Sequence, residues 1–189
     1  MDKKAKLYQI VKAQSLIYDK SEKVCDNQTF DYHIQRVINN AVKFAKMRGG
    51  DIEVVEISAL FHDYANLVDM AKYGDTHHII GGEFAEPILL EHGYSQAFVD
   101  KVKKCIYSHR ASIVKDKISI EEICLADADG VAHIENVVEL IMWRGQCGDS
   151  IEAGNNFVKN KIKKTYAKLS YWAKEYIKER YEATLKIFY

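Results

Sequence analysis

Residues 57–65 read ISALFHDYA, and the rest of the chain is organised around this stretch. The stretch closes an apolar helical pattern with two adjacent polar side chains, His62 and Asp63. Adjacent side chains diverge by roughly 100° within a helix, but at a helix end they can turn toward one point. A histidine nitrogen and a carboxylate oxygen suit a borderline divalent metal. Taken alone, the pair is a weak signal, because the dipeptide is common and more often is a histidine favoured by the helix dipole beside a solvated aspartate.

Length and composition narrow the class of protein. The chain has 189 residues, which favours one domain with a core that needs no disulfide. Lys and Arg together number 27, as do Asp and Glu, so net charge gives no reason to expect bulk binding to nucleic acid or to a membrane. No apolar run approaches the ~18 residues needed to span a bilayer. The four cysteines form no CxxC pair, which indicates reduced thiols and a cytoplasmic location.

Helical periodicity dominates and predicts an all-α fold. We expect caps at Asp51, Ser95 and Ser119, the last in a capping box with Glu122. The expected helices cover about 4–18, 31–48, 51–63, 78–92, 96–109, 119–145 and 151–187, and a polar loop covers about 64–76. We therefore predict a domain with an N-terminal helix over 1–150. A long C-terminal helix over 151–189 is expected to pack on that domain, with a homodimer interface as the alternative.

Polar side chains suited to metal binding recur at the ends of these helices or within them. In chain order they are His33, the His62–Asp63 pair, His77 or His78, His109 and Asp127. Helix ends that meet at one cleft can place nitrogen and oxygen ligands around an ion. Asp127 and Asp129 both fall in an apolar run, where a carboxylate is costly to bury unless it is paired or bound to metal. His92 and His133 match no pattern and are interpreted as surface or core residues.

This order resembles the HD-domain superfamily of metal-dependent phosphohydrolases. In that family a histidine is followed by a His-Asp pair, in many members by two more histidines, and then by an aspartate. The resemblance covers about 30–135 and is carried by HIQRV at 33–37, LFHDY at 60–64, HHIIGGEFA at 77–85, IYSH at 106–109 and LADADG at 125–130. The last motif selects Asp127 over Asp129. The resemblance implies an HD-domain helical bundle.

The resemblance also implies roles for the individual residues. The implied metal ligands are His33, His62, Asp63 and Asp127, and the divalent metal is Mn, Fe, Co, Ni, Zn or Mg. Asp63 would also orient a water in catalysis.

His77 and His109 have two interpretations. They either help to bind a second metal or, with one metal, contact the substrate phosphate or donate a proton. We favour one metal, because Asn66, in the segment Tyr64-Ala65-Asn66 after the pair, bridges metals less well than a carboxylate. That segment also departs from the family pattern, so no general acid is assigned from it.

Four further residues are candidates for binding the phosphate. Arg36, Lys72 and Arg110 are the cations best placed for this role, because a guanidinium or ammonium group can donate several hydrogen bonds to phosphate. His78 is a further candidate for substrate binding. Each of the three cations is equally consistent with a solvated surface charge.

The expected function is hydrolysis of a phosphomonoester or pyrophosphate bond in a small phosphorylated metabolite, with a nucleotide as the leading substrate. One alternative is a module that binds metal or nucleotide without hydrolysis. The other is a di-iron oxygenase, which needs two redox metals and all six ligands.

Overall fold

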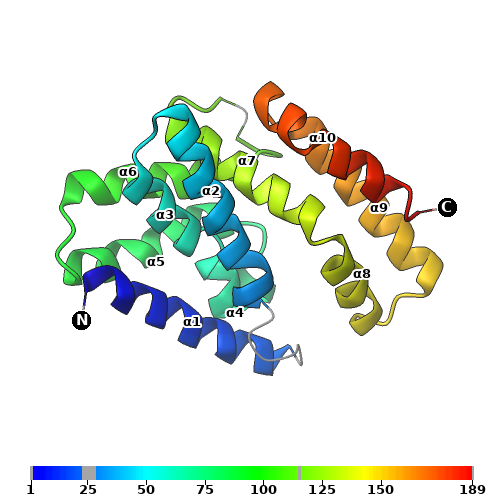
Figure 1. The fold of residues 1–189 in the computed structure, drawn as a ribbon. Helices are drawn as coiled ribbons and strands as arrows, with labels where there is room; N and C mark the ends of the chain where they lie inside the picture. Colours follow the sequence, from blue (N-terminus) through cyan, green and yellow to red (C-terminus); the bar gives the residue numbers. More distant parts are fainter. Residues whose placement is uncertain (1, 23–28, 115, 189) are drawn as a thin grey trace.

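The computed structural model describes residues 2–22, 29–114 and 116–188, and these residues form helices and no strand (Figure 1). The helices are α1 (Lys3–Ser21), the π-helix η1 (Thr29–Ile34), α2 (Gln35–Arg48), α3 (Ile52–Phe61), α4 (Tyr64–Tyr73), α5 (His77–Glu91), α6 (Gln96–Ser108), α7 (Ile120–Glu135), α8 (Val137–Gln146), α9 (Ile151–Lys168) and α10 (Tyr171–Leu185). The predicted all-α fold is confirmed.

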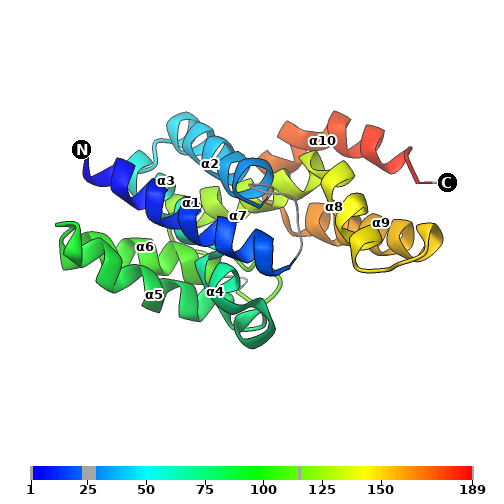
Figure 2. The same ribbon diagram turned by 90° about the horizontal axis from the view of Figure 1, so that it is seen from below.

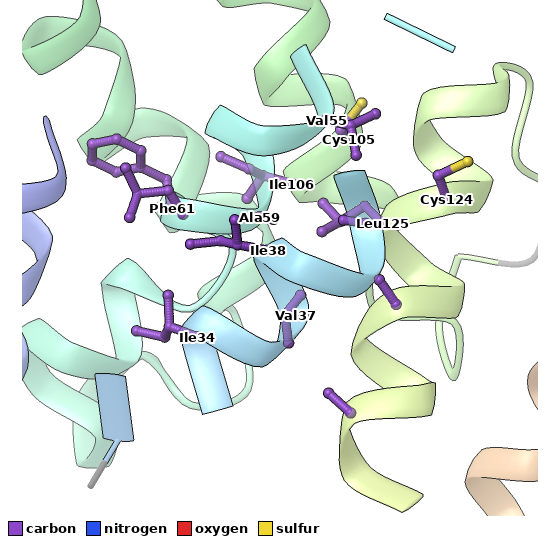
Figure 3. Packing of buried hydrophobic residues seen from close by; sticks show 14 of the residues in the cluster. Ile34, Val37, Ile38, Val55, Ala59, Phe61, Cys105, Ile106, Cys124 and Leu125 are labelled. Carbon is purple, nitrogen blue, oxygen red and sulfur yellow. The ribbon is translucent and has the colours of Figure 1, made fainter. Parts of the chain in front are cut away.

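The core lies among α2, α3, α5, α6 and α7, and α1 crosses α3 and α4 (Figures 1 and 2). Phe44, Phe61 and Ile106 are among its largest fully buried side chains. Each such side chain stabilises the fold by roughly 1.5–3 kcal/mol through burial of apolar surface. Figure 3 shows the part of this core that η1, α2, α3, α6 and α7 supply. The polar residues of the site lie on or directly beside η1, α3, α5, α6 and α7, so the core holds them in place.

The predicted helix caps are confirmed. Asp51 accepts a hydrogen bond from Val54 N at 3.2 Å, and Ser95 accepts one from Phe98 N at 3.3 Å. Ser119 forms the complete capping box at the start of α7. These side chains satisfy backbone N–H groups that have no partner in the first helical turn.

The predicted polar loop over 64–76 is wrong, because most of it forms α4. Ala65 and Leu67 are buried, and the Leu67 carbonyl accepts a hydrogen bond from Gln14 of α1 at 2.9 Å. The backbone leaves the helical region at Asp69 (φ −163°, ψ 94°), where the Asp69 side chain accepts a hydrogen bond from Lys72 N at 3.0 Å. The remaining side chains are largely exposed, so their polar composition concealed a helix with one narrow buried face.

The predicted C-terminal helix over 151–187 is divided into α9 and α10. Leu169 has extended backbone angles (φ −60°, ψ 149°), and Ser170 caps α10 by accepting a hydrogen bond from Ala173 N at 3.2 Å. Both helices pack on α7 and add apolar residues to the same core. A Cβ atom at Gly130 of α7 would lie 2.6 Å from Leu169 Cδ2, so glycine permits this close approach.

None of the helices in the described ranges combines the length and apolar character needed to cross a membrane.

Candidate metal centre

The His62–Asp63 pair lies where α3 ends and α4 begins. Asp63 has backbone angles φ −108° and ψ 13°, which interrupt the helix and turn the two side chains toward one region. His62 Nε2 lies 3.5 Å from Asp63 Oδ2. The helix end thus brings adjacent side chains together, which a regular helix interior would not do.

A first group of possible ligands surrounds Asp63 Oδ2. His33, in the π-helix η1, places its Nε2 3.4 Å from Asp63 Oδ2 and 3.2 Å from His62 Nε2. Asp129 of α7 brings its Oδ1 to 3.6 Å from His33 Nε2. One ligand atom each from His33, His62 and Asp129 lies within 4.8 Å of the others. This mixture of imidazole nitrogen and carboxylate oxygen fits a borderline divalent metal.

A second group surrounds the other oxygen of the same carboxylate. His77 Nε2, at the start of α5, lies 3.5 Å from Asp63 Oδ1, and His109 Nε2, at the end of α6, lies 4.0 Å from it. The two imidazole Nε2 atoms are 3.2 Å apart. Asp63 therefore stands between two groups of ligands and presents one oxygen to each.

Backbone hydrogen bonds determine the tautomers of three histidines. Nδ1 of His62, His77 and His109 lies 2.7, 2.6 and 2.5 Å from the carbonyl oxygens of Ala59, Gly74 and Ile106. A carbonyl oxygen only accepts, so each Nδ1 carries a hydrogen, and the neutral form of each ring presents a lone pair at Nε2. The Nε2 atoms of His77 and His109 and one oxygen of Asp63 thus point toward the same position. Such a point needs a cation, and the donor set fits one.

The carboxylates remain ionised despite their burial. Burial alone would raise the pKa of Asp63, but the charge of His62 and the hydrogen bond from His33 hold it well below its usual range. Burial opposes ionisation of Asp129 too, yet His133 and His33 lower its pKa to about 2. Burial and the neighbouring His62 lower the pKa of His109 to about 4. Burial lowers the pKa of His33, but its hydrogen bond to Asp63 and the charge of Asp129 raise it above the ordinary value. The cluster therefore offers anionic oxygens at neutral pH, and metal binding at His33 would release a proton.

The structure does not bring Asp127 to this cluster, contrary to the expectation that selected it over Asp129. Asp127 accepts hydrogen bonds from Ser170 N at 2.9 Å and from Ser170 Oγ at 2.6 Å. Its Oδ2 also lies 3.6 Å from Arg48 Nη1. Two residues correspond to about 200° around a helix, so Asp127 and Asp129 project from opposite faces of α7. Asp127 thus connects α7 to the end of α2 and to the start of α10. Asp129, on the other face, lies in the place where the sequence predicted a ligand from this helix.

His133 belongs to the site, contrary to its interpretation as an unrelated surface or core residue. Its ring stacks on that of His33 with centroids 5.0 Å apart, and its Nε2 lies 3.5 Å from Asp129 Oδ1. Burial and the charge of Lys161 lower the pKa of His133 to about 3. The spacing could have revealed it, because His133 follows Asp129 by four residues and thus shares its helix face.

The cluster opens into a cavity of about 530 Å³. Within the described part of the chain, the Phe, Tyr and Trp side chains that line it are Tyr18, Tyr32, Trp143 and Phe157. Part of the cavity wall comes from α7, α8 and α9. Residues far apart in the chain therefore enclose the site.

The four residues expected to bind phosphate differ in whether they line the cavity. Arg110 lines the cavity. Among the described residues around it, Arg36, Lys72 and His78 are not part of the cavity wall. Lys72 is exposed with its Nζ 4.9 Å from the Tyr73 ring centroid, and His78 is buried beside Tyr107 with ring centroids 5.7 Å apart. Only Arg110 of this set can contact a molecule in the cavity as the structure stands.

The fold and the paired ligand groups define a helical protein with a histidine–aspartate metal centre. Residues 30–134, more than half of the chain, match the family model of the HD domain, and the chain belongs to the HD-domain family. The matched segment includes all the ligand residues but ends within α7, before α8, α9 and α10.

One solved structure has a closely similar fold. It is the crystal structure of a predicted HD superfamily hydrolase from an uncultured Thermotogales bacterium. The identity is 24%, the TM-score is 0.60, and the alignment covers 93% of this chain and 91% of that chain. The likeness shows that the C-terminal helices belong to a shared fold. None of the curated proteins matches the sequence.

Proposed function

We propose that this protein is a metal-dependent phosphohydrolase that acts on a small phosphorylated metabolite. The observation that carries the proposal is that histidine Nε2 atoms gather around both oxygens of Asp63. Membership of the HD-domain family and the similarity to a predicted HD superfamily hydrolase support the same reaction class.

Two ions fit the ligand groups better than the single ion favoured by the sequence. His33, His62 and Asp129 would hold one ion, and His77 and His109 would hold the other. Asp63 would bridge them, so the absence of a carboxylate at position 66 does not prevent a two-ion centre. A divalent ion in such a site lowers the pKa of water and polarises a phosphoryl group.

Other residues of the chain hold the centre and the substrate in position. Asn66 Nδ2 donates a hydrogen bond to Asp63 Oδ1 at 2.9 Å and thereby orients the shared carboxylate. His133 supports Asp129 and stacks on His33. Arg110 presents a guanidinium group at the cavity, where it can donate two hydrogen bonds to a phosphate.

A nucleotide is the substrate class that we favour. The aromatic lining of the cavity offers ring faces and edges to a base. Stacking of a base on an aromatic side chain is favourable for every base, because each has a π face. A cavity of about 530 Å³ is large enough for a small metabolite of this kind.

The test is hydrolysis of a panel of nucleotides, sugar phosphates and p-nitrophenyl phosphate by protein loaded with Mn²⁺, Co²⁺ or Mg²⁺. We expect turnover that Asp63→Ala abolishes and that Asp100→Ala leaves unchanged, because Asp100 is exposed on α6 outside the cluster. Full activity of Asp63→Ala, or no turnover with any metal, would contradict the proposal. Nucleotide binding without turnover would favour a binding module instead.

A di-iron oxygenase is the second candidate, and the observation in its favour is the complete set of six ligands around two positions. Purification without oxygen, followed by iron analysis and an absorption spectrum, separates the two functions. Two bound irons with an oxygen-dependent colour change would favour the oxygenase. Activity with Mn²⁺ or Mg²⁺ alone would favour the hydrolase.

A further inference from the structure

Helix α9 forms a cavity wall although it lies outside the segment that matches the HD domain. Lys161, Thr165 and Lys168 of this helix line the cavity. Their spacings of four and three residues place them on one helix face. The C-terminal segment therefore contributes a polar, cationic surface to the site.

Neither of the two lysines in this set is held in an ion pair by a carboxylate of the described residues. Lys161 is only partly exposed, whereas Lys168 is exposed where it lines the cavity. The carboxylates lining the cavity are Asp63 and Asp129, which face the histidines, and Glu139 on α8. Unpaired ammonium groups in a cavity indicate a site for an anion.

Positive charges gather at this end of the cavity. Partial burial and the charges of Lys161, Lys164 and Arg110 lower the pKa of Lys168. Among the described residues, Arg110 is paired with the fully exposed Asp75, at 3.6 Å, and with the Asp75 carbonyl. Lys161 and Arg110 thus both repel Lys168 in the free protein, and an anion bound beside these groups would relieve that repulsion.

The cationic surface lies next to the metal centre. Lys161, His33 and His133 line the same cavity, and the charge of Lys161 lowers the pKa of His133. Lys168 is likewise within electrostatic reach of Asp129. An anionic group bound by these lysines would therefore sit beside a phosphate held at the His33 group.

We propose that Lys161 and Lys168 of α9, together with Arg110, bind a second phosphate group, so the substrate carries at least two phosphates. This inference rests on the proposed phosphohydrolase function and narrows its substrate class. Lys161 and Lys168 act as specificity-determining residues, since they contact the part of the substrate away from the reacting phosphorus. The aromatic side chains remain free to bind the organic part of the molecule.

A binding experiment tests the inference without relying on turnover. Methylenediphosphonate, which has two phosphonate groups and resists hydrolysis, is titrated into Mn²⁺-loaded protein in a calorimeter, and methylphosphonate serves as the probe with one group. The test variant is Lys161→Gln combined with Lys168→Gln. The matched control is Lys163→Gln, because Lys163 is exposed on the same helix but outside the cavity wall.

We expect the double variant to lose about tenfold or more in affinity for methylenediphosphonate, as charge-assisted hydrogen bonds are lost. Its affinity for methylphosphonate should stay close to that of the unmodified protein. Lys163→Gln should bind both probes normally, and Lys161→Arg should retain most of the affinity because it keeps the charge.

Three results would overturn the inference. They are equal affinity of the double variant and the unmodified protein for methylenediphosphonate, an equal loss for both probes, and no binding of either probe to the unmodified protein. Failure of the hydrolase proposal looks different, because it would show as no turnover of any phosphate ester regardless of probe affinity. Hydrolysis of p-nitrophenyl phosphate with no preference between the two probes would leave the hydrolase proposal intact and remove the second phosphate site.

Discussion

The two faces of α7 carry aspartates only two residues apart, and their surroundings differ completely. Asp129 faces His33, His62 and His133, while Asp127 faces Arg48 and Ser170. Their pKa shifts are opposite, because burial raises the pKa of Asp127 despite its hydrogen bonds, whereas the histidines lower that of Asp129 to about 2. One face of the helix is arranged to hold a cation, and the other joins three helices.

The difference shows that the free-energy cost of burying a carboxylate can be offset in two ways, by hydrogen bonds and a neighbouring cation of the protein or by a bound metal ion. Asp127 is satisfied by two hydrogen bonds and an adjacent guanidinium, and it needs no ion. Asp129 has histidine nitrogens as neighbours, and a cation would complete its surroundings. Variants of the two residues should therefore affect different properties of the protein.

The largest expected effect is that of Asp129→Ala on activity. Removing this oxygen ligand should lower metal-dependent hydrolysis by more than about 100-fold, because loss of a partner that merely supports a ligand already costs 10–100-fold. Turnover of p-nitrophenyl phosphate and the metal content after dialysis are the measurements. Asp127→Ala should retain its metal. If Asp129→Ala kept both metal and activity, the assignment of this face to metal binding would be wrong.

Asp127→Ala should instead destabilise the fold. It leaves the Ser170 N–H and hydroxyl without their acceptor and the Arg48 charge without its partner, a loss of about 3 kcal/mol. In a chain of this size that corresponds to a fall of roughly 10 °C in Tm. Thermal unfolding followed by circular dichroism measures the effect. Loss of metal with an unchanged Tm would reverse the two roles.

A smaller effect is expected from pH on protein treated with a chelator. His109 and His133 have pKa values of about 4 and about 3 when folded, below the value of roughly 6.5 in an unfolded chain. The unfolded chain therefore takes up more protons between pH 6.5 and 4, so stability is highest above pH 6.5 and falls as the solution is acidified. The raised pKa of His33 offsets part of this loss, and we expect Tm to fall by roughly 5–10 °C between pH 7 and pH 5.

Two variants sharpen this pH test. His133→Phe should show a weaker pH dependence over the same range, because it removes one of the two histidines that stay neutral when folded. Asp127→Ala should have a lower Tm throughout but the same slope, since its side chain contacts no histidine among the described residues. Identical slopes for His133→Phe and the unmodified protein would show that His133 does not titrate as described.

Much of the fold could be predicted because it depends on local patterns. Apolar residues at helical spacing and the caps Asp51, Ser95 and Ser119 act within a few residues of the chain, so they are visible in the sequence. Helix α4 was missed because its buried face is narrow, and its partner α1 is distant in the chain. The break at Leu169 was missed because the apolar stripe continues across it.

For the site, the sequence by itself determined which residue types were available and the order His33, His62–Asp63, His77, His109 along helix ends. These five residues meet in the structure because each lies where a helix begins, ends or changes form. Only the tertiary structure decided between Asp127 and Asp129, brought in His133, and placed Lys161 and Lys168 at the cavity. The physical reason is that local spacing shows which side chains share a helix face, but the packing of distant helices determines what that face meets.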